Sequence, residues 1–458
     1  MTLSRSAFVV PSATARSPRP APRVVDPDLA DPDLADPDLA DPDLAGSVLA
    51  DAGRIGPRGG FWLIAIAFTV AMAFASVPAP LYPLYQGRDD LSALTVTIVF
   101  VMYAAGVVAS LLLAGHLSDR VGRKRILVPA LGLEVLAALL LLIWPDLPGL
   151  ITARLLSGLA VGLVTATATA YLHDLHSISR PDAGPSRFEL VSTAANFGGL
   201  GAGTLIAGLL AQFATAPLRT PYGVFVVLIL VSVVAVGLSP ETVPDSAERF
   251  RYRPQRIRVA SADRTRYVVA AASAFTAFAI FGLFTSLASG FVAGTLHHPG
   301  GLLAGAVVFA VFGAAALAQI ATSHLTPGRR FGLGLPAEAA GMVVLAAGMR
   351  EASLAAFLIG GTLAGAGAGV LFKSALGTVA AMAADRVRGE ALAGLFLIAY
   401  AGLSLPTVGL GLATRYTGAT TATLWFTGVL LMLLAATAAL AWCTRRESRH
   451  VRSGYSRP

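Results

Sequence analysis

Twelve apolar runs, each long enough to cross a lipid bilayer as a helix, constrain this chain more than any other feature of its sequence. A bilayer core about 30 Å thick requires about 20 apolar residues in a helix. Only 13% of the residues are charged and 55% are hydrophobic, so lipid is the solvent for most of the chain. The sequence predicts an all-α integral membrane protein with spans at 61–85, 91–114, 126–145, 150–172, 190–213, 221–239, 267–292, 301–322, 332–349, 353–376, 391–413 and 419–442.

The basic residues of the connectors indicate how the spans are oriented. One set of alternate connectors holds seventeen Lys or Arg residues, whereas the opposite set holds four: Arg88, Arg219, Arg350 and Arg415. Lys and Arg are held on the cytoplasmic side of a membrane. Both termini are therefore predicted to be cytoplasmic, in the cytoplasmic (inner) cell membrane, and the basic connectors are expected to contact anionic lipid headgroups.

The chain divides around its longest and most basic internal connector. Related features recur on either side of it, such as Gly122-Arg123-Lys124 before the third span and Gly328-Arg329-Arg330 before the ninth, which favours a duplicated six-helix unit. Four copies of Asp-Pro-Asp-Leu-Ala near the N-terminus prevent a regular helix. The expected organisation is a disordered cytoplasmic tail (1–59), a first half (60–240), a basic cytoplasmic central loop (241–266), a second half (267–443) and a basic cytoplasmic tail (444–458).

The connector between the second and third spans reads Gly-His-Leu-Ser-Asp-Arg-Val-Gly-Arg-Lys-Arg over residues 115–125. Gly115 permits close backbone approach at a helix end, Asp119 can pair with a cation or a helix N-terminus, and the basic cluster can meet headgroups. A generic basic connector would explain the Arg and Lys residues. It would not require Gly, Asp and Gly at these spacings.

This connector closely resembles the signature loop of the major facilitator superfamily. The number of spans and the alternation of basic and non-basic connectors extend the resemblance over about 61–442. The resemblance implies two six-helix halves and a loop that latches them in one conformation. By that analogy the latch residues are Gly115, Asp119, Arg120, Gly122, Arg123 and Lys124. Asp119 would face the start of the eleventh span near Gly389. The related connector before the ninth span has no acid at the position aligned with Asp119, which argues against a symmetric latch.

Two glycine-containing spans carry further resemblances. Arg154, with Gly158 and Gly162 in the fourth span, is similar to a superfamily motif whose Arg is linked to proton transfer; the alternative is an Arg that snorkels to the interface. The glycine-rich stretch 198–208 is similar to the antiporter motif, although Thr204 replaces the expected Pro. The alternative is close helix packing, for which the candidates are Gly158, Gly162, Gly199 and Gly203.

Other intramembrane polar residues are candidates for the transport site. Glu134 lies near the middle of the third span, where an ionised carboxylate is costly, so it is either a proton carrier or a buried structural acid. Glu338 is expected at the cytoplasmic interface. Three prolines at 78, 80 and 83 are expected to break the outer end of the first span. Residues expected to line a cavity are Tyr82, Tyr85, Gln86, Asn196 and Lys373, although the tyrosines could instead form an interfacial belt and Lys373 could snorkel from the cytoplasmic end.

Several classes of protein are disfavoured. Lys373-Ser374 follows Phe372 where a phosphate-binding loop needs Gly, the seven His are scattered and Cys443 is the single cysteine. No enzyme, cofactor, metal or nucleotide is therefore expected. Nucleic acid is not expected either, because no basic stretch is interleaved with aromatic stacking residues. The sequence predicts a secondary transporter that exports a small organic solute by alternating access, coupled to protons. An uptake symporter or facilitator for a sugar or organic acid, and a non-transporting sensor or scaffold acting through the acidic repeats, remain alternatives.

Overall fold

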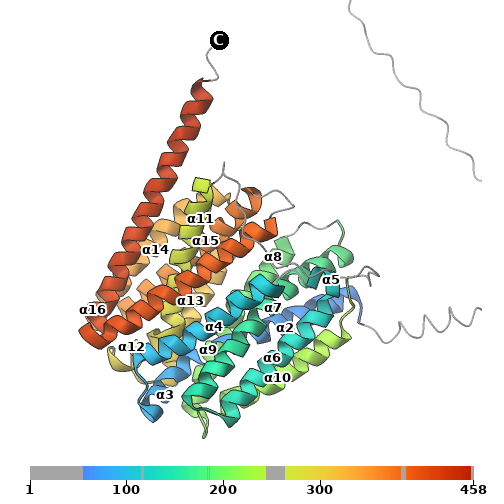
Figure 1. The fold of residues 1–458 in the computed structure, drawn as a ribbon, viewed down its shortest axis with the longest axis vertical. Coiled ribbons are helices and arrows are strands. Elements are labelled where there is room, and N and C mark those ends of the chain that lie inside the picture. Colours follow the sequence, from blue (N-terminus) through green and yellow to red (C-terminus); the bar gives the residue numbers. More distant parts are fainter. Residues whose placement is uncertain are drawn as a thin grey trace, which may run out of the picture. The chain divides into compact units, whose positions relative to one another are not determined.

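The computed structural model describes residues 55–114, 118–182, 184, 186–243, 264–382 and 388–454, without the side chains of residues 114, 119, 120, 388, 389 and 444–454 (Figure 1). Residues 1–54 of the expected N-terminal tail, which include its repeats, most of the central loop and the side chains of the C-terminal tail lie outside this part of the chain. The last residues of the expected tail are described, and a helix begins among them at Pro57. All regular structure among the described residues is helical.

The first half contains six membrane-crossing units. In chain order they are α2 (Pro57–Ser76) with η2 (Ala79–Leu81) and α3 (Tyr82–Asp89); α4 (Ala93–Ala114); α6 (Arg123–Ile143), after the short α5 (Ser118–Val121); α7 (Leu147–Ser179); α8 (Ser186–Thr193), η3 (Ala194–Gly198) and α9 (Gly199–Phe213); and α10 (Thr220–Leu238).

The second half begins at α11 (Arg264–Ser286), which continues into α12 (Ala288–Gly294). The remaining helices are α13 (Gly301–Ala321), α14 (Pro327–Arg350), α15 (Leu354–Met382) and α16 (Arg388–Gly454). Helices α7 and α15 both extend beyond the expected spans at their C-terminal ends. Hydropathy marks the apolar run of a helix and not the polar turns that continue it.

Eleven continuous segments of the described chain are long and apolar enough to cross a membrane. The last, Glu390–Cys443, has 54 residues, more than twice the about 20 that a bilayer requires. Its backbone leaves the helical region at Gly418 (φ 77°, ψ 164°), where the chain turns back (Figure 1). Because Gly418 divides α16 into two spans, the prediction of an all-α membrane protein with twelve spans is confirmed.

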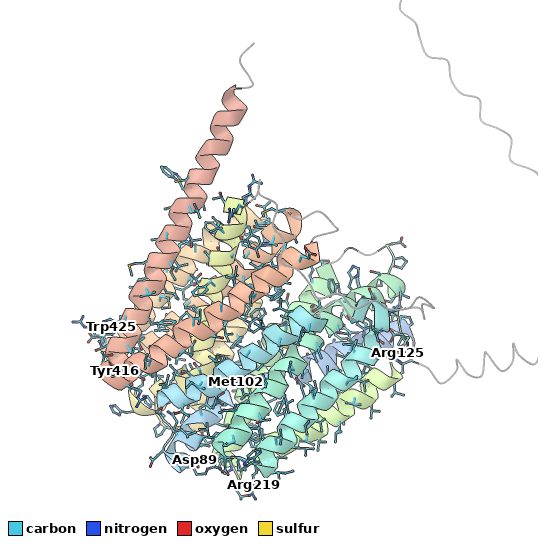
Figure 2. The ribbon with its side chains drawn as sticks, viewed as in Figure 1. Asp89, Met102, Arg125, Arg219, Tyr416 and Trp425 are labelled. Atoms are coloured by element: carbon cyan, nitrogen blue, oxygen red, sulfur yellow. The ribbon has the colours of Figure 1, made fainter. Side chains whose placement is uncertain are left out.

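The outer surface of the bundle is apolar. On α10, Val227, Val231 and Val234 are each about 60% exposed and recur at the i, i+4, i+7 spacing of one helix face. Such a stripe is unfavourable in water, whereas lipid is a suitable solvent for it. Polar residues instead gather at the helix ends: Asp89 and Arg219 lie at one end of the first half, and Arg125 lies at the opposite end (Figure 2).

Two spans depart from a regular α-helix. The prediction that prolines break the first span is confirmed, because α2 stops at Ser76 and a short 3₁₀ turn precedes α3. The fifth span contains an unexpected π-helical segment, Ala194–Gly198. Such segments widen the helix locally and are frequent at functional sites; this one carries Asn196 and Phe197, which face the interior described next.

Candidate functional site

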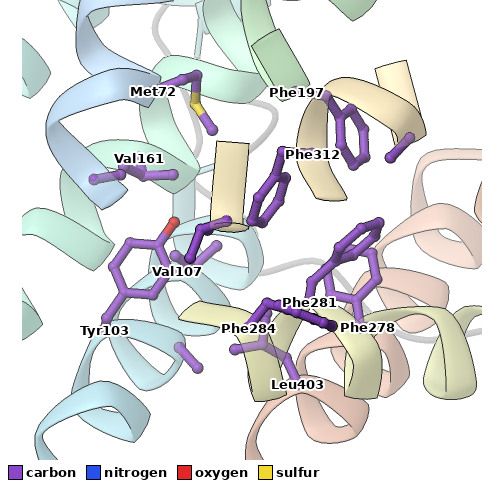
Figure 3. Close-up of a cluster of buried hydrophobic side chains, with 14 of the residues drawn as sticks. Met72, Tyr103, Val107, Val161, Phe197, Phe278, Phe281, Phe284, Phe312 and Leu403 are labelled. Carbon is purple, nitrogen blue, oxygen red and sulfur yellow. The ribbon is translucent and has the colours of Figure 1, made fainter. Parts of the chain in front are cut away.

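A cavity of ≈ 240 Å³ lies where the two halves meet. The first half contributes α2, α4, α7 and the π-helical segment of the fifth span, and the second half contributes α11, α13, α15 and α16. Figure 3 shows Met72 and Tyr103 of the first half on one side, and Phe278, Phe281 and Phe312 of the second half on the other. A cavity with walls from both halves changes whenever one half moves against the other.

Arg154 is the one charged side chain among the residues that line this cavity. It is 3% exposed, so it is directed into the bundle and does not snorkel. Its Nη1 donates a hydrogen bond to the Ala75 carbonyl oxygen at 2.8 Å, and its guanidinium carbon lies 4.4 Å from the centre of the Tyr103 ring. Its Nε has no hydrogen-bond partner among the described residues.

The part of the lining that the second half contributes is rich in aromatic rings. Phe281 and Phe312 stack with ring centres 5.0 Å apart, and Phe278 lies 4.9 Å from Phe372 and 5.3 Å from Tyr400. Offset and edge-to-face pairs at these distances stabilise each other beyond their buried area. The second half therefore presents a packed aromatic surface to whatever occupies the cavity.

Of the five residues expected to line a cavity, the structure places only Asn196 in this lining. Tyr85 is buried away from it, with its hydroxyl 3.2 Å from that of Tyr222. Tyr82 is also buried, and its hydroxyl has no partner among the described residues. Gln86 lines a separate pocket together with Ser92 and Gly290.

Lys373 lies just beside the cavity instead of in its lining. Its Nζ donates to the Gln319 carbonyl oxygen at 3.1 Å and lies 3.9 Å from a carboxylate oxygen of Glu189. Gln319 belongs to α13 and Glu189 to α8, so Lys373 joins the second half to the first. Its side chain is 14% exposed, so these contacts hold it inside the bundle.

The two acids of the third and ninth spans are buried in the interior of each half. Glu134 is fully buried in α6 and does not line the cavity, and its carboxylate oxygens have no hydrogen-bond partner in the described chain. The prediction that Glu338 is interfacial is wrong, since it is also fully buried. Helix α14 begins at Pro327, which places Glu338 three turns from the end and against Gly367 of α15.

Comparisons with known proteins identify the family. The family model described as Major Facilitator Superfamily matches residues 64–337, more than half of the chain. The chain belongs to the major facilitator superfamily. It is therefore a membrane transporter, and the resemblance drawn from the loop at 115–125 is confirmed.

Solved structures of this superfamily share the fold. The human organic anion transporter MFSD10 (TETRAN) is 16% identical with a TM-score of 0.60, over 84% of this chain and 100% of that one. The nucleoside transporter NupG, solved as a point mutant, is 10% identical with a TM-score of 0.64, over 83% of this chain and 99% of that one. No curated protein sequence matches the chain.

The superfamily's signature loop leads into the N-terminus of α6. Gly122 has a φ of 113°, a conformation that other residues rarely adopt. Directly after it, the backbone N–H groups of Arg123 and Lys124 donate to the two carboxylate oxygens of Glu241 at 3.0 and 2.9 Å. Gly115 and the side chains of Asp119 and Arg120 lie outside the described structure.

Arg123 links this loop to the fourth span. Its side chain is 9% exposed, and its Nε donates to Asp174 of α7 at 3.0 Å. Sequence reasoning missed Asp174 and Glu241, because both contact the loop from more than fifty residues away. One signal could have indicated Glu241: it is an acid at the end of the sixth span, and carboxylates stabilise helix N-termini such as that of α6.

Removing the Glu241 carboxylate is expected to destabilise the transporter. Glu241→Ala leaves two N–H groups at the start of α6 without an acceptor, which should lower the free energy of unfolding by about 1–2 kcal/mol. The apparent Tm of purified protein measures this, with Glu351→Ala as the control because that carboxylate is 73% exposed. Equal Tm values for the two variants would show that the contact contributes nothing.

The four candidate packing glycines all lie at helix crossings. A Cβ on Gly158 would stand 2.0 Å from the Tyr103 carbonyl oxygen, and one on Gly162 would stand 1.9 Å from Ser110 Oγ, both on α4. Gly199 and Gly203 face α2 in the same way. The backbone of α4 therefore lies close to that of α7, and the backbone of α2 lies close to that of α9.

Proposed function

We propose that this transporter exports a small organic solute by alternating access, with the central cavity as its binding site and protons as the coupling ion. The observation that carries the proposal is the cavity itself, since eight spans from both halves line it. Its apolar walls with a few polar groups are typical of sites for small organic molecules. The names of the structural neighbours, an organic anion transporter and a nucleoside transporter, accord with such a solute.

The proposed orientation places both termini in the cytoplasm of a cell whose inner membrane holds the protein. It rests on the seventeen basic residues in one set of connectors against four in the other. Anionic headgroups would bind the basic side. The signature loop with Asp119 lies at this end and would latch the halves during the transport cycle.

Proton coupling is proposed to involve Glu134 and Arg154. Helix α6, which carries Glu134, packs along α7, which carries Arg154. A carboxyl group this deeply buried and without a partner is costly to ionise, so gain or loss of its proton would alter how α6 and α7 pack. Arg154, at the cavity wall, would pass that change to the bound solute.

Transport into everted membrane vesicles tests the direction and the coupling. The probes are labelled benzoate, naphthalene-2-carboxylate and 4-phenylbutanoate, each with its primary amide and its amine. We expect vesicles containing the protein to accumulate at least one probe, and an uncoupler to abolish this. In proteoliposomes with an imposed pH gradient, Glu134→Gln and Arg154→Ala should each lower gradient-driven transport at least tenfold.

Each alternative predicts a different result. Accumulation by intact cells and none by everted vesicles would favour an uptake symporter or facilitator. Absence of transport of every probe, with binding partners lost on deletion of residues 1–59, would favour a sensor or scaffold. Gradient-driven transport that is unchanged in both variants would remove the proton-coupling assignment.

A further inference from the structure

The central cavity contains a buried cation that the protein itself does not neutralise. Arg154 has no Asp or Glu within ion-pair distance in the described part of the chain, and no carboxylate lines the cavity there. A charge taken out of water is strongly unfavourable unless a counter-charge compensates it. The neighbouring groups, one carbonyl and two aromatic rings, supply only partial negative charge.

The guanidinium retains unused hydrogen-bonding capacity. Arginine offers five N–H donors, and the structure gives one of them an acceptor, the Ala75 carbonyl oxygen. Nε is buried and without a partner in the described chain. A planar fork of free donors matches the two oxygens of a carboxylate, so an anion bound here would supply the missing charge and the missing acceptors together.

The remainder of the lining specifies what the anion is attached to. Besides Phe100, whose ring lies against Arg154, six phenylalanines and Tyr400 from both halves line the cavity: Phe197, Phe278, Phe281, Phe312, Phe372 and Phe396. An inorganic anion would leave these rings facing water. A ligand with an apolar, preferably flat, body would cover them.

The remaining polar groups add no second charge. Asn196 and the buried Gln319 amide, whose Nε2 has no partner in the described chain, are uncharged. Lys373, whose neighbour Phe372 lines the cavity, is itself outside the lining and lies 3.9 Å from Glu189. The single guanidinium can therefore be neutralised by a ligand with one anionic group. The same guanidinium would repel a cationic solute.

We propose that the solute of this transporter is an amphipathic organic monoanion, whose carboxylate or equivalent group binds Arg154 while its apolar body packs on the phenylalanine wall. The inference rests on the proposed function, because it assigns the substrate class of the same cavity. It also assigns Arg154 a role in recognition in addition to the one proposed in coupling.

Binding to the purified full-length protein tests this without requiring transport. The ligands are the three carboxylates named above with their matched amides and amines, titrated against apparent Tm and heat of binding. Wild type should bind at least one carboxylate at least tenfold more tightly than its amide or amine. Arg154→Gln should abolish that preference, and Arg154→Lys should keep part of it because the charge is retained.

Two further variants separate recognition from folding. Arg219→Gln removes an exposed arginine that does not line the cavity and should leave the preference unchanged. Phe281→Leu should weaken carboxylate and amide by the same factor, since it alters only the apolar wall. If Arg154→Gln does not fold, Arg154→Lys together with the wild-type ratio of carboxylate to amide affinity still decides the proposal.

The outcomes keep the two proposals apart. Equal affinity for carboxylates and amides, tighter binding of amines, no binding of any carboxylate, or a preference that survives Arg154→Gln would each overturn the anion assignment. Transport of amides or amines in those cases would leave the transporter assignment intact. Arg154-dependent carboxylate binding without transport would support the anion site and contradict the proposed function.

Discussion

Replacing Gly203 with alanine is expected to prevent α9 from packing correctly on α2. The added Cβ would lie 1.9 Å from the Ala73 carbonyl oxygen and 2.6 Å from Ser76 Oγ, and the first contact is with backbone that cannot rotate away. Overpacking of this kind costs about 1–3 kcal/mol. Separation of the helices would also break the 2.6 Å hydrogen bond from Ser76 Oγ to the Leu200 carbonyl oxygen.

The larger Gly203→Leu variant should yield almost no monodisperse protein after solubilisation, and Gly203→Ala should show a clearly lowered apparent Tm. Gly223→Ala is the matched control, because no atom lies within 4 Å of its added Cβ. That variant should be unchanged or slightly more stable, since alanine is the better helix former. Equal stability of the two alanine variants would mean that α9 and α2 are not in close contact.

The sequence predicted the spans well because apolar length reports directly on the solvent around a helix. The run at 301–322 corresponds to α13 at Gly301–Ala321, and the two runs after 390 correspond to the parts of α16 on either side of Gly418. Hydropathy could not show that Glu338 is buried. The apolar run covers 332–349, but α14 begins five residues earlier, at Pro327. Glu338 therefore lies deeper in the helix than the run indicated.

The candidate site was only partly visible from the sequence. Arg154 could be singled out because a charge inside a span is rare, and the structure places it at the cavity wall. The aromatic wall could not be predicted, since a phenylalanine that faces lipid and one that faces a cavity satisfy the same apolar pattern. The contact of Glu241 with α6 depends on two segments 118 residues apart, which no local pattern encodes.

A disulfide between the halves is expected to abolish transport. Thr97 of α4 and Gly411 of α16 meet where the two halves touch: a Cβ on Gly411 would lie 2.6 Å from Thr97 Oγ1 and 2.8 Å from Thr97 Cγ2. Both of these atoms are one bond from the Thr97 Cβ, so the two Cβ atoms lie close to the about 3.5–4.5 Å that a disulfide requires.

The pair Thr97→Cys and Gly411→Cys would be made in a Cys443→Ser background, because Cys443 is an exposed free thiol. Oxidation fixes α4 to α16 and should lower transport at least tenfold, because alternating access requires the halves to separate on each side in turn. Each single-cysteine variant is a control for the substitution itself. Neither should respond to the oxidant.

The central claim is that movement of the two halves about the shared cavity carries the solute across the membrane. The most direct test is the rate of probe transport by the double-cysteine protein in proteoliposomes, measured after oxidation and again after reduction. We predict transport at the level of empty liposomes when the disulfide is complete, and recovery of the rate on addition of reductant. A fully cross-linked protein that transports the probe as fast as the reduced protein does would contradict the claim.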